Sequence, residues 1–219
     1  MPEALALAAG AAQTDITPDP AMVNWVDDKP YDGGLDPLAV RVLVLEDEAC
    51  SAALVSWDLI DATEESVAQV RNAVGSVAGI PAAHVLVGAT HTHSAPDITG
   101  EFHWPGSALN VVRGIMFGAN RSDRYIIWMT MRIVKMVKEL IENLEPCKMA
   151  WTKEKFNPDL VINRRHPTQK PILDLGVITF KSIEKNELVG FIINYACHPT
   201  SLSYINNKLS ADYPGRVIH

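Results

Sequence analysis

The sequence predicts an α/β fold with a mixed β-sheet flanked by helices. Residues 51–89 have the pattern of a strand, a helix and a strand in that order, which is typical of a crossover unit with two parallel strands. Residues 172–197 instead have the pattern of two apolar strands joined by the polar turn "IEKNE", which indicates an antiparallel hairpin. The chain has 219 residues, enough to bury a sizeable core, so we expect one domain over residues 1–219.

The first predicted elements are extended. "AQTDITPDP", at residues 12–20, predicts a short extended segment that ends at Pro18 and Pro20, because proline cannot donate to a sheet ladder. Residues 38–47 and 51–58 are strongly apolar and β-branched, and only a short polar segment separates them. They are therefore expected to form two neighbouring strands.

Residues 62–79 predict a helix that leads into a third strand. Thr63 is the expected N-cap, acidic residues follow in the first turn, and Gly79 ends the helix. The helix is expected to pack through one apolar face, formed by Val67, Val70, Val74 and Val77. The next strand, at residues 84–89, would then lie parallel to the strand that precedes the helix.

The middle of the chain predicts a long loop and a long helix. Residues 100–121 lack a clear period and are expected to form an irregular loop, whose aromatic residues either line an apolar acyl pocket or pack in the core. These residues are Phe102, Trp104 and Phe117. Residues 122–144 predict a helix that is apolar nearly all round, so we expect it to lie between two layers of the fold.

The last predicted elements are strands. Residues 148–156 are expected to form an edge strand, and residues 172–182 and 187–197 the two arms of the hairpin. An exposed sheet edge favours association between chains, so a homo-oligomer is one expected state.

Composition excludes several classes of protein. The net charge of -7 is spread along the chain without a basic cluster, which argues against a nucleic-acid partner. No apolar stretch approaches the roughly 20 residues of a membrane-spanning helix. The first ten residues lack the basic residues of a secretory leader, and the three cysteines are widely separated without a CxxC pair. We therefore expect a cytoplasmic protein in a reducing compartment.

Two histidines follow the third predicted strand. His91 and His93 flank a single threonine, and side chains at positions i and i+2 of a strand point to the same face. Neutral imidazole is a common zinc ligand, so this spacing predicts a metal site. The alternative is that the histidines cap the strand or bond to nearby backbone. Ser94, beside them, could be an activated nucleophile, but we interpret it as a turn residue.

His198 repeats this design at the end of the second hairpin strand, where it precedes a proline and a hydroxyl residue. Two such strand ends can meet at one edge of a sheet, where α/β enzymes place their ligands. Asp58 ends another strand and could orient an imidazole, bind metal or act as a turn cap. Asp212 has the same possible roles. Arg164 could stabilise an oxyanion or be plain surface charge.

These motifs resemble the neutral/alkaline, non-lysosomal ceramidases. "THTHSAP" resembles that family's THTHSGP signature, and "HPTS" followed by "SADYPG" is similar to its HPTS and S-D-x-x-G stretch. "TDIT", "VSWDLI" and "INR" also occur in the family's order. The resemblance implies a zinc amidase acting on a ceramide-like or other acyl amide of the kind handled in sphingolipid metabolism.

The resemblance also implies a role for individual residues. It makes His91 and His198 the zinc ligands, has His93 assist at the scissile amide, and has Arg164 contact substrate or developing charge. Asp58 is expected in a supporting position. A zinc-bound water, its pKa lowered towards about 7, would attack the amide carbonyl while zinc polarises the carbonyl oxygen.

In the family, a Glu and a Tyr complete the zinc sphere and a Ser is proposed as catalytic, all from sequence beyond the HPTS motif. We therefore expect the chain to be a truncated N-terminal portion of such a catalytic domain. Two alternatives remain. One is a non-catalytic binding or assembly module. The other is a metallohydrolase of another substrate class, such as a phosphoesterase or a metallo-β-lactamase-like enzyme, although the HxHxDH spacing of the latter is absent.

Overall fold

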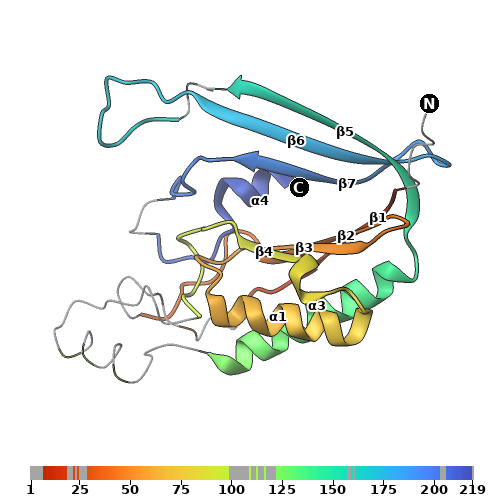
Figure 1. The fold of residues 1–219 in the computed structure, drawn as a ribbon. Coiled ribbons are helices and arrows are strands. Elements are labelled where there is room, and N and C mark those ends of the chain that lie inside the picture. The colour runs from red at the N-terminus through yellow and green to blue at the C-terminus, as the bar shows by residue number, and fades with distance from the viewer. Residues whose placement is uncertain are drawn as a thin grey trace.

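The protein folds around a seven-stranded mixed sheet with the strand order β4-β3-β2-β1-β5-β6-β7 (Figure 1). The computed structural model describes residues 7–18, 22, 24, 29–98, 109, 112, 116, 122–156, 159, 161–202 and 206–218. Helices flank the sheet, so the predicted fold class is confirmed.

The first half of the sheet contains the predicted crossover unit. Strands β1 (Ala8–Asp15), β2 (Ala39–Glu46) and β3 (Ser51–Trp57) pair antiparallel in sequence order. Strand β4 (Val85–Ala89) pairs parallel with β3, across helix α1 (Glu64–Ala78) and a single 3-10 turn. The parallel pair places the ends of β3 and β4 at the same edge of the sheet, as the sequence predicted.

Helix α1 begins and ends as its sequence predicts. The Thr63 hydroxyl accepts a hydrogen bond from Ser66 N, and Gly79 has a φ of 71°, the left-handed conformation that glycine adopts without steric cost. Val70 and Val74 are fully buried, whereas Val77 is 49% exposed, so the packed face of the helix is narrower than the valine pattern predicted.

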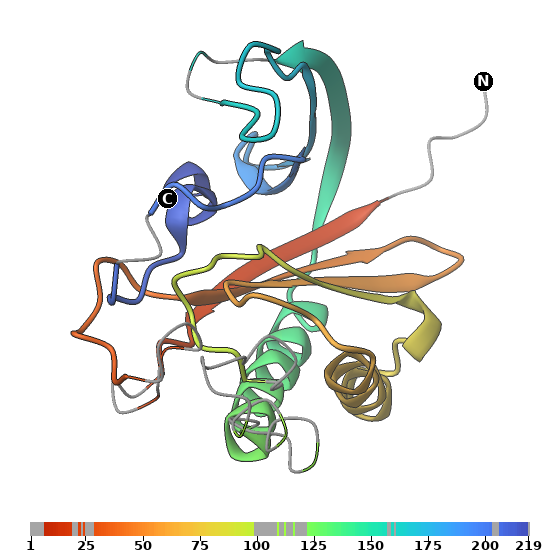
Figure 2. The same ribbon diagram turned by 90° about the vertical axis from the view of Figure 1, so that its left-hand side faces the viewer.

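The second half of the sheet is a hairpin-based layer that folds over the first half. Strand β5 (Glu145–Phe156) pairs with β6 (Leu173–Ser182), which pairs with β7 (Leu188–Tyr195). Strand β5 pairs with β1 at only two positions, through Glu145 and Pro146, so the sheet turns sharply there. Figure 2 shows the resulting arrangement, with β5–β7 above β1–β4, and with helices α1 and α3 (Asp123–Ile141) below.

The fold has three layers: helices α1 and α3, strands β1–β4, and strands β5–β7. Two hydrophobic cores hold these layers together, and β2 contributes to both. Val40, Val42 and Val44 are buried in the larger core against α1 and α3, while Leu43 is buried in a smaller core with Cys147 and Phe180. Because side chains of a strand alternate between faces, β2 is apolar on both sides. Its continuous apolar sequence is therefore the consequence of its central position.

A glycine permits close contact between the two strand layers. A Cβ added to Gly190 in β7 would lie 2.9 Å from the Ala11 Cβ in β1 and 3.3 Å from a Leu43 methyl group in β2. Real Cβ atoms essentially never approach another atom under 3.0 Å. The absence of a side chain at Gly190 thus sets how closely β7 approaches the inner strands.

Helix α3 (Asp123–Ile141) differs from its prediction in one respect. Its bounds agree with the sequence, and Met129 and Ile133 are fully buried against the sheet. On the opposite face Ile127 is 52% and Met131 68% exposed, so the expectation that two layers enclose the helix is wrong. The sequence revealed apolar residues nearly all round the helix, but not that those on its outer face stay exposed.

Most of the predicted 100–121 loop lies outside the described residues, and Phe102, Trp104 and Phe117 with it. The described Leu109, Val112 and Met116 have helical backbone and are exposed. Within the described part of the chain, no helix combines the length and apolar character needed to cross a bilayer.

Candidate metal centre

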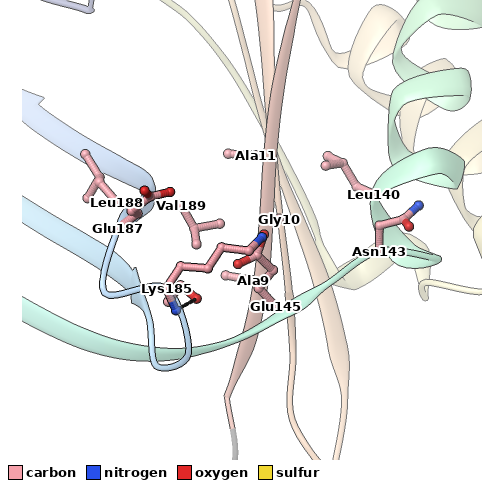
Figure 3. A pocket seen from close by; sticks show the side chains of 11 residues that line it. Ala9, Gly10, Ala11, Leu140, Asn143, Glu145, Lys185, Glu187, Leu188 and Val189 are labelled. Carbon is pink, nitrogen blue, oxygen red and sulfur yellow. Dashed lines mark hydrogen bonds and ion pairs between the residues drawn. The ribbon is translucent and has the colours of Figure 1, made fainter.

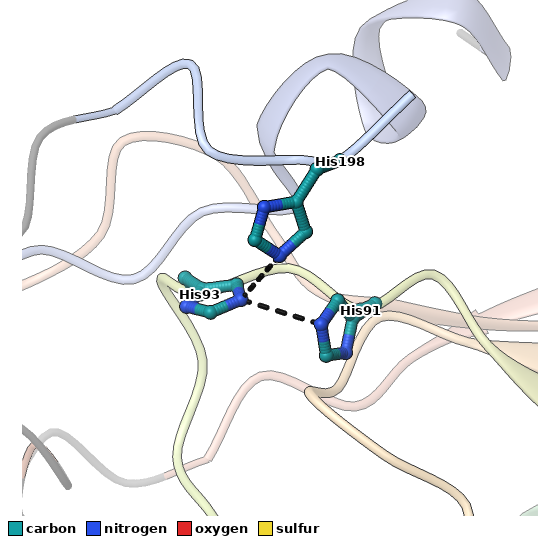
Figure 4. Close-up of side chains that lie close together, drawn as sticks. All are labelled: His91, His93 and His198. Carbon is teal, nitrogen blue, oxygen red and sulfur yellow. Dashed lines mark hydrogen bonds between the residues drawn. The ribbon is translucent and has the colours of Figure 1, made fainter. Parts of the chain in front are cut away.

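Three imidazoles from two layers of the fold meet at one point (Figure 4). His91 and His93 follow β4, and His198 follows β7. The Nε2 atom of His93 lies 3.4 Å from Nε2 of His91 and 2.9 Å from Nε2 of His198. The sequence predicted that these strand ends would converge, and they do so where the folded-over layer meets the first.

The separations between these nitrogens fit a shared ion. Zinc binds imidazole nitrogen at about 2.0–2.1 Å in tetrahedral geometry, which places two ligand nitrogens roughly 3.3 Å apart. The three candidate nitrogens all lie within 4.8 Å of one another. Three histidines match the number of protein ligands that a catalytic zinc usually has.

The environment of His91 fixes which nitrogen faces the centre. Its Nδ1 lies 2.5 Å from the Ile60 carbonyl oxygen, and because a carbonyl can only accept, Nδ1 carries the proton. The lone pair of Nε2 therefore points to the other imidazoles, as in metal-bound histidines that donate their second N–H to a backbone carbonyl.

The convergence does not come from strand geometry. Strand β4 ends at Ala89, and His91 has a φ of 66°, a left-handed conformation that is uncommon for residues other than glycine. Such backbone strain concentrates at functional sites, where the surrounding structure maintains it. Asp212 also has a positive φ, of 55°.

The centre disfavours protonated imidazole. Burial, followed by the charges of His198, His91 and Arg164, lowers the pKa of His93 to about 4, against a smaller opposing effect of Asp212. Burial also lowers the pKa of His198, with contributions from His91 and Arg164. At neutral pH both rings are therefore in the neutral form that coordinates metals.

Arg164 lies at the rim of the centre. Its Nη2 lies 3.4 Å from Nδ1 of His198, and a guanidinium can only donate, so this contact requires the lone pair of His198 at Nδ1. Coordination through Nε2 requires the lone pair at the other nitrogen. The two interactions of His198 therefore compete. The Asn163 side chain accepts hydrogen bonds from the backbone N–H groups of Arg165 and His166, which shapes the loop around Arg164.

Asp58 is fully buried one residue after β3, and its described contacts are to the neighbouring strand. Its carboxylate accepts a hydrogen bond from Ala39 N and forms an ion pair with Arg41 at 2.9 Å. A buried carboxylate needs such partners because desolvation of a charge is costly. These bonds hold β2 to the end of β3, and a supporting role of Asp58 at the histidines stays a prediction.

Asp212 is buried at the first turn of α4 (Asp212–Ile218) and anchors the loop after His198. Its carboxylate accepts hydrogen bonds from Ser201 N and Leu202 N, at 3.4 and 3.2 Å. The next residue, Tyr213, donates its hydroxyl proton to the Cys197 carbonyl oxygen at 2.7 Å. The backbone is thus held on both sides of His198.

The sequence did not reveal some residues that position the pair of histidines. Thr92 donates its hydroxyl proton to the Ser210 carbonyl oxygen, and Ser210 N donates to the Ser94 carbonyl oxygen. Asp36 in turn accepts hydrogen bonds from the Ser210 hydroxyl and from Ala211 N. Ser94 is buried in this network, in agreement with a turn role. The only signal for these partners was that Thr92 and Ser210 lie inside the motifs "THTHSAP" and "SADYPG".

A separate hollow of about 290 Å³ lies between β1, the end of α3 and the turn joining β6 to β7 (Figure 3). The ion pair between Lys185 and Glu145 crosses it at 2.6 Å. None of the predicted site residues lines this hollow.

Solved structures share this arrangement of strands and helices. A crystal structure of neutral ceramidase from Pseudomonas aeruginosa matches with a TM-score of 0.70 at 20% identity, covering 96% of this chain and 35% of the ceramidase chain. A ceramidase complexed with C2 matches with a TM-score of 0.69 at 20% identity, covering 95% of this chain and 34% of the other. The fold is that of part of a neutral ceramidase.

The chain spans about a third of the length of these two ceramidases. No family model matches it, and neither does any curated protein. The likeness to the ceramidases is thus a likeness of fold, and it covers nearly the whole of this chain.

Proposed function

We propose that the chain carries the histidine cluster of a zinc-dependent, ceramidase-like amidohydrolase, whose substrate is a lipid or other small acyl amide. The observation that carries the proposal is the convergence of three Nε2 atoms, one of them fixed by the bond from His91 to the Ile60 carbonyl. The ceramidase fold and the motifs "THTHSAP" and "HPTS" support membership of that family. A cytoplasmic location stays a prediction.

Each residue has a proposed task. His91 and His198 would hold the zinc ion, which supplies Lewis acidity toward an acyl carbonyl and acidifies a water molecule. His93 is neutral above a pH of about 4, so its ring can accept a proton near the scissile amide. Arg164 can donate hydrogen bonds to negative charge that develops on the carbonyl oxygen. Asp212 would hold the loop of His198 in place.

The geometry allows a second role for His93. Its Nε2 is as close to the other two nitrogens as a third ligand would be, and this chain alone would then supply the usual three. A ligand and a proton acceptor differ in one measurable respect, because removal of a ligand abolishes metal binding whereas removal of a base lowers only the rate.

The test is metal content by elemental mass spectrometry on the purified parent and on His91→Ala, His198→Ala and His93→Ala. We expect about one zinc per chain in the parent and none in the first two variants. His166→Ala is the matched control, because His166 is exposed and outside the cluster. Zinc retained by His91→Ala or His198→Ala would contradict the shared site.

The activity test uses the same proteins with zinc supplied. Release of fatty acid is measured from N-acyl sphingoid bases and from simpler acyl amides of several chain lengths. If His93 is the proton acceptor, His93→Ala keeps its zinc and loses about 10²- to 10⁴-fold in kcat. A zinc-loaded parent that cleaves none of the amides would contradict the proposed amidohydrolase and favour the two alternatives, a binding or assembly module or a metallohydrolase of another substrate class.

A further inference from the structure

Strand β5 has a long open edge. Beyond its two pairs with β1, the strand is bonded along one side only, to β6. From Lys148 to Phe156 every residue is exposed, and no strand of the described part of the chain covers the other side. Figure 1 shows β5 as the outermost strand of its layer. Trp151 is 73% and Met149 56% exposed on this strand, an apolar content that free edges usually avoid.

The charges on this edge are arranged unevenly. Lys153 and Lys155 each form an ion pair with Asp174, at 2.9 and 2.5 Å, so these two lysines share one carboxylate within the chain. Lys148 instead lies directly opposite Lys181 on β6, and like charges in that position are unfavourable.

Glu154 lies opposite Leu175 on β6. The apolar Leu175 side chain cannot pair with the Glu154 carboxylate. Within the described residues, neither Lys148 nor Glu154 has an ion pair. One unmatched charge of each sign therefore stands on the same face of β5, six positions apart.

We propose that β5 pairs antiparallel with β5 of a second copy of this chain, with the two Trp151 residues opposite each other. A two-fold axis at Trp151 places Lys148 opposite Glu154 of the second copy, and the reverse, so two ion pairs form. Met149 lies opposite Lys153 in this register. Cross-strand aromatic and opposite-charge pairs are the contacts that stabilise antiparallel strands.

Neighbouring registers lack this match. An axis at Thr152 would place Lys148 opposite Phe156 and Trp151 opposite Lys153, with no pair of opposite charges. An axis at Lys153 would place two lysines opposite each other, which is unfavourable. Strand β5 is self-complementary, because it carries both members of the ion pair at positions equally distant from Trp151. This favours a second copy of the chain over a different partner, and the two-fold symmetry gives a closed dimer.

The test is the molar mass in solution, by light scattering across a range of concentrations. The chain has a mass of 24.0 kDa, and we expect the measured mass to rise to twice that value as concentration increases. Glu154→Lys and Lys148→Glu should each remain monomeric, because each places two like-charged pairs across the edge. The double variant, with both charges exchanged, should again dimerise.

Matched controls carry the same charge changes on helix α3 or at its end. Lys138→Glu and Glu142→Lys alter exposed residues that lie outside β5 and should dimerise like the parent. Circular dichroism checks that every variant is folded. A parent that stays at the mass of one chain at all concentrations would overturn the proposal. A dimer that neither single exchange weakens, or that the double exchange fails to restore, would also overturn it.

Discussion

At the scale of the residue, Arg164 and a metal ion place opposite demands on His198. The guanidinium needs the lone pair at Nδ1, whereas coordination needs it at Nε2. Arg164 is also one of the charges that lower the pKa of both His93 and His198. The same positive charge would repel a divalent cation.

Replacement of Arg164 therefore separates affinity from catalysis. In Arg164→Gln we expect zinc to bind roughly three- to tenfold more tightly, because one repelling charge is lost and the shorter neutral amide competes less for His198. The rate of amide hydrolysis should fall nevertheless, since a shorter, neutral amide replaces the charged donor for the developing oxyanion. Zinc titration with a competing chelator measures the first effect and kcat the second. Arg165→Gln is the matched control, and zinc bound more weakly by Arg164→Gln would contradict this account.

The lowered pKa of His93 makes the stability of the metal-free protein depend on pH. The unfolded chain takes up a proton near pH 6.5 and folded His93 only near pH 4, so the unfolded state binds more protons between these values. The contribution of His93 to the free energy of unfolding is therefore full above about pH 6.5 and is lost as the pH falls to about 4.

Urea unfolding of chelator-treated protein at several pH values measures this effect. The parent should lose more stability between pH 6.5 and 4 than His93→Gln, whose side chain does not titrate. Equal slopes for the two proteins would show that folded His93 titrates normally. His166→Gln, changed at an exposed histidine, should follow the parent.

At this scale the sequence revealed the side chains of the centre better than their surroundings. The motifs predicted His91, His93 and His198 together, because each histidine lies in the loop just after an apolar strand. The left-handed backbone at His91 and its bond to Ile60 depend on how the loop packs, and no local pattern encodes them. Asp36 is distant in sequence from both motifs, so its bonds to Ser210 and Ala211 were not predictable either.

At the scale of the element, the approach of β7 to β1 positions His198. Gly190→Ala should destabilise the fold by about 1–3 kcal/mol, because its Cβ would meet another Cβ at 2.9 Å and a layer would have to shift. Since β7 leads to His198, we expect zinc affinity to fall as well. Urea unfolding and zinc titration measure the two effects.

Gly176→Ala is the matched control for Gly190→Ala, since both glycines lie in the folded-over layer. The nearest atom to a Cβ at Gly176 is 3.8 Å away, an ordinary contact. This variant should retain the stability and zinc affinity of the parent. Equal stability of the two variants would indicate that the layers are not in close contact at Gly190.

The strands and helices themselves were largely predictable. The apolar, β-branched runs of β2 and β3 and the capping residues of α1 are local signals, and the structure agrees with them. The exposure of the outer face of α3 was not predictable, because Ile127 and Met131 are apolar residues that nevertheless lie on the surface. A pattern of apolar residues indicates what can be buried, and only the tertiary fold determines which of them are.

At the scale of the whole molecule, the sequence predicted a mixed sheet but not how the sheet folds back. The turn depends on β1 pairing with β5 at only two positions, a long-range feature with no local signature. It is nevertheless what brings His198 from the second layer to His91 and His93 in the first. A zinc ion in the cluster would therefore connect the two layers, so that metal binding and the docking of the layers stabilise each other.

The central position of β1 also determines the order in which the chain can fold during synthesis. Strand β1 precedes the other six strands of this sheet in the sequence, yet its second neighbour begins only at Glu145. Most of the larger core, apart from Leu209 and Ala211, comes from residues made before that point. The helix-covered layer can therefore assemble while β5–β7 are still being translated, leaving one side of β1 unpaired on the ribosome. His198 is made after the other two histidines of the cluster. A chain interrupted before His198 would therefore hold only His91 and His93, on a first layer that is nearly complete.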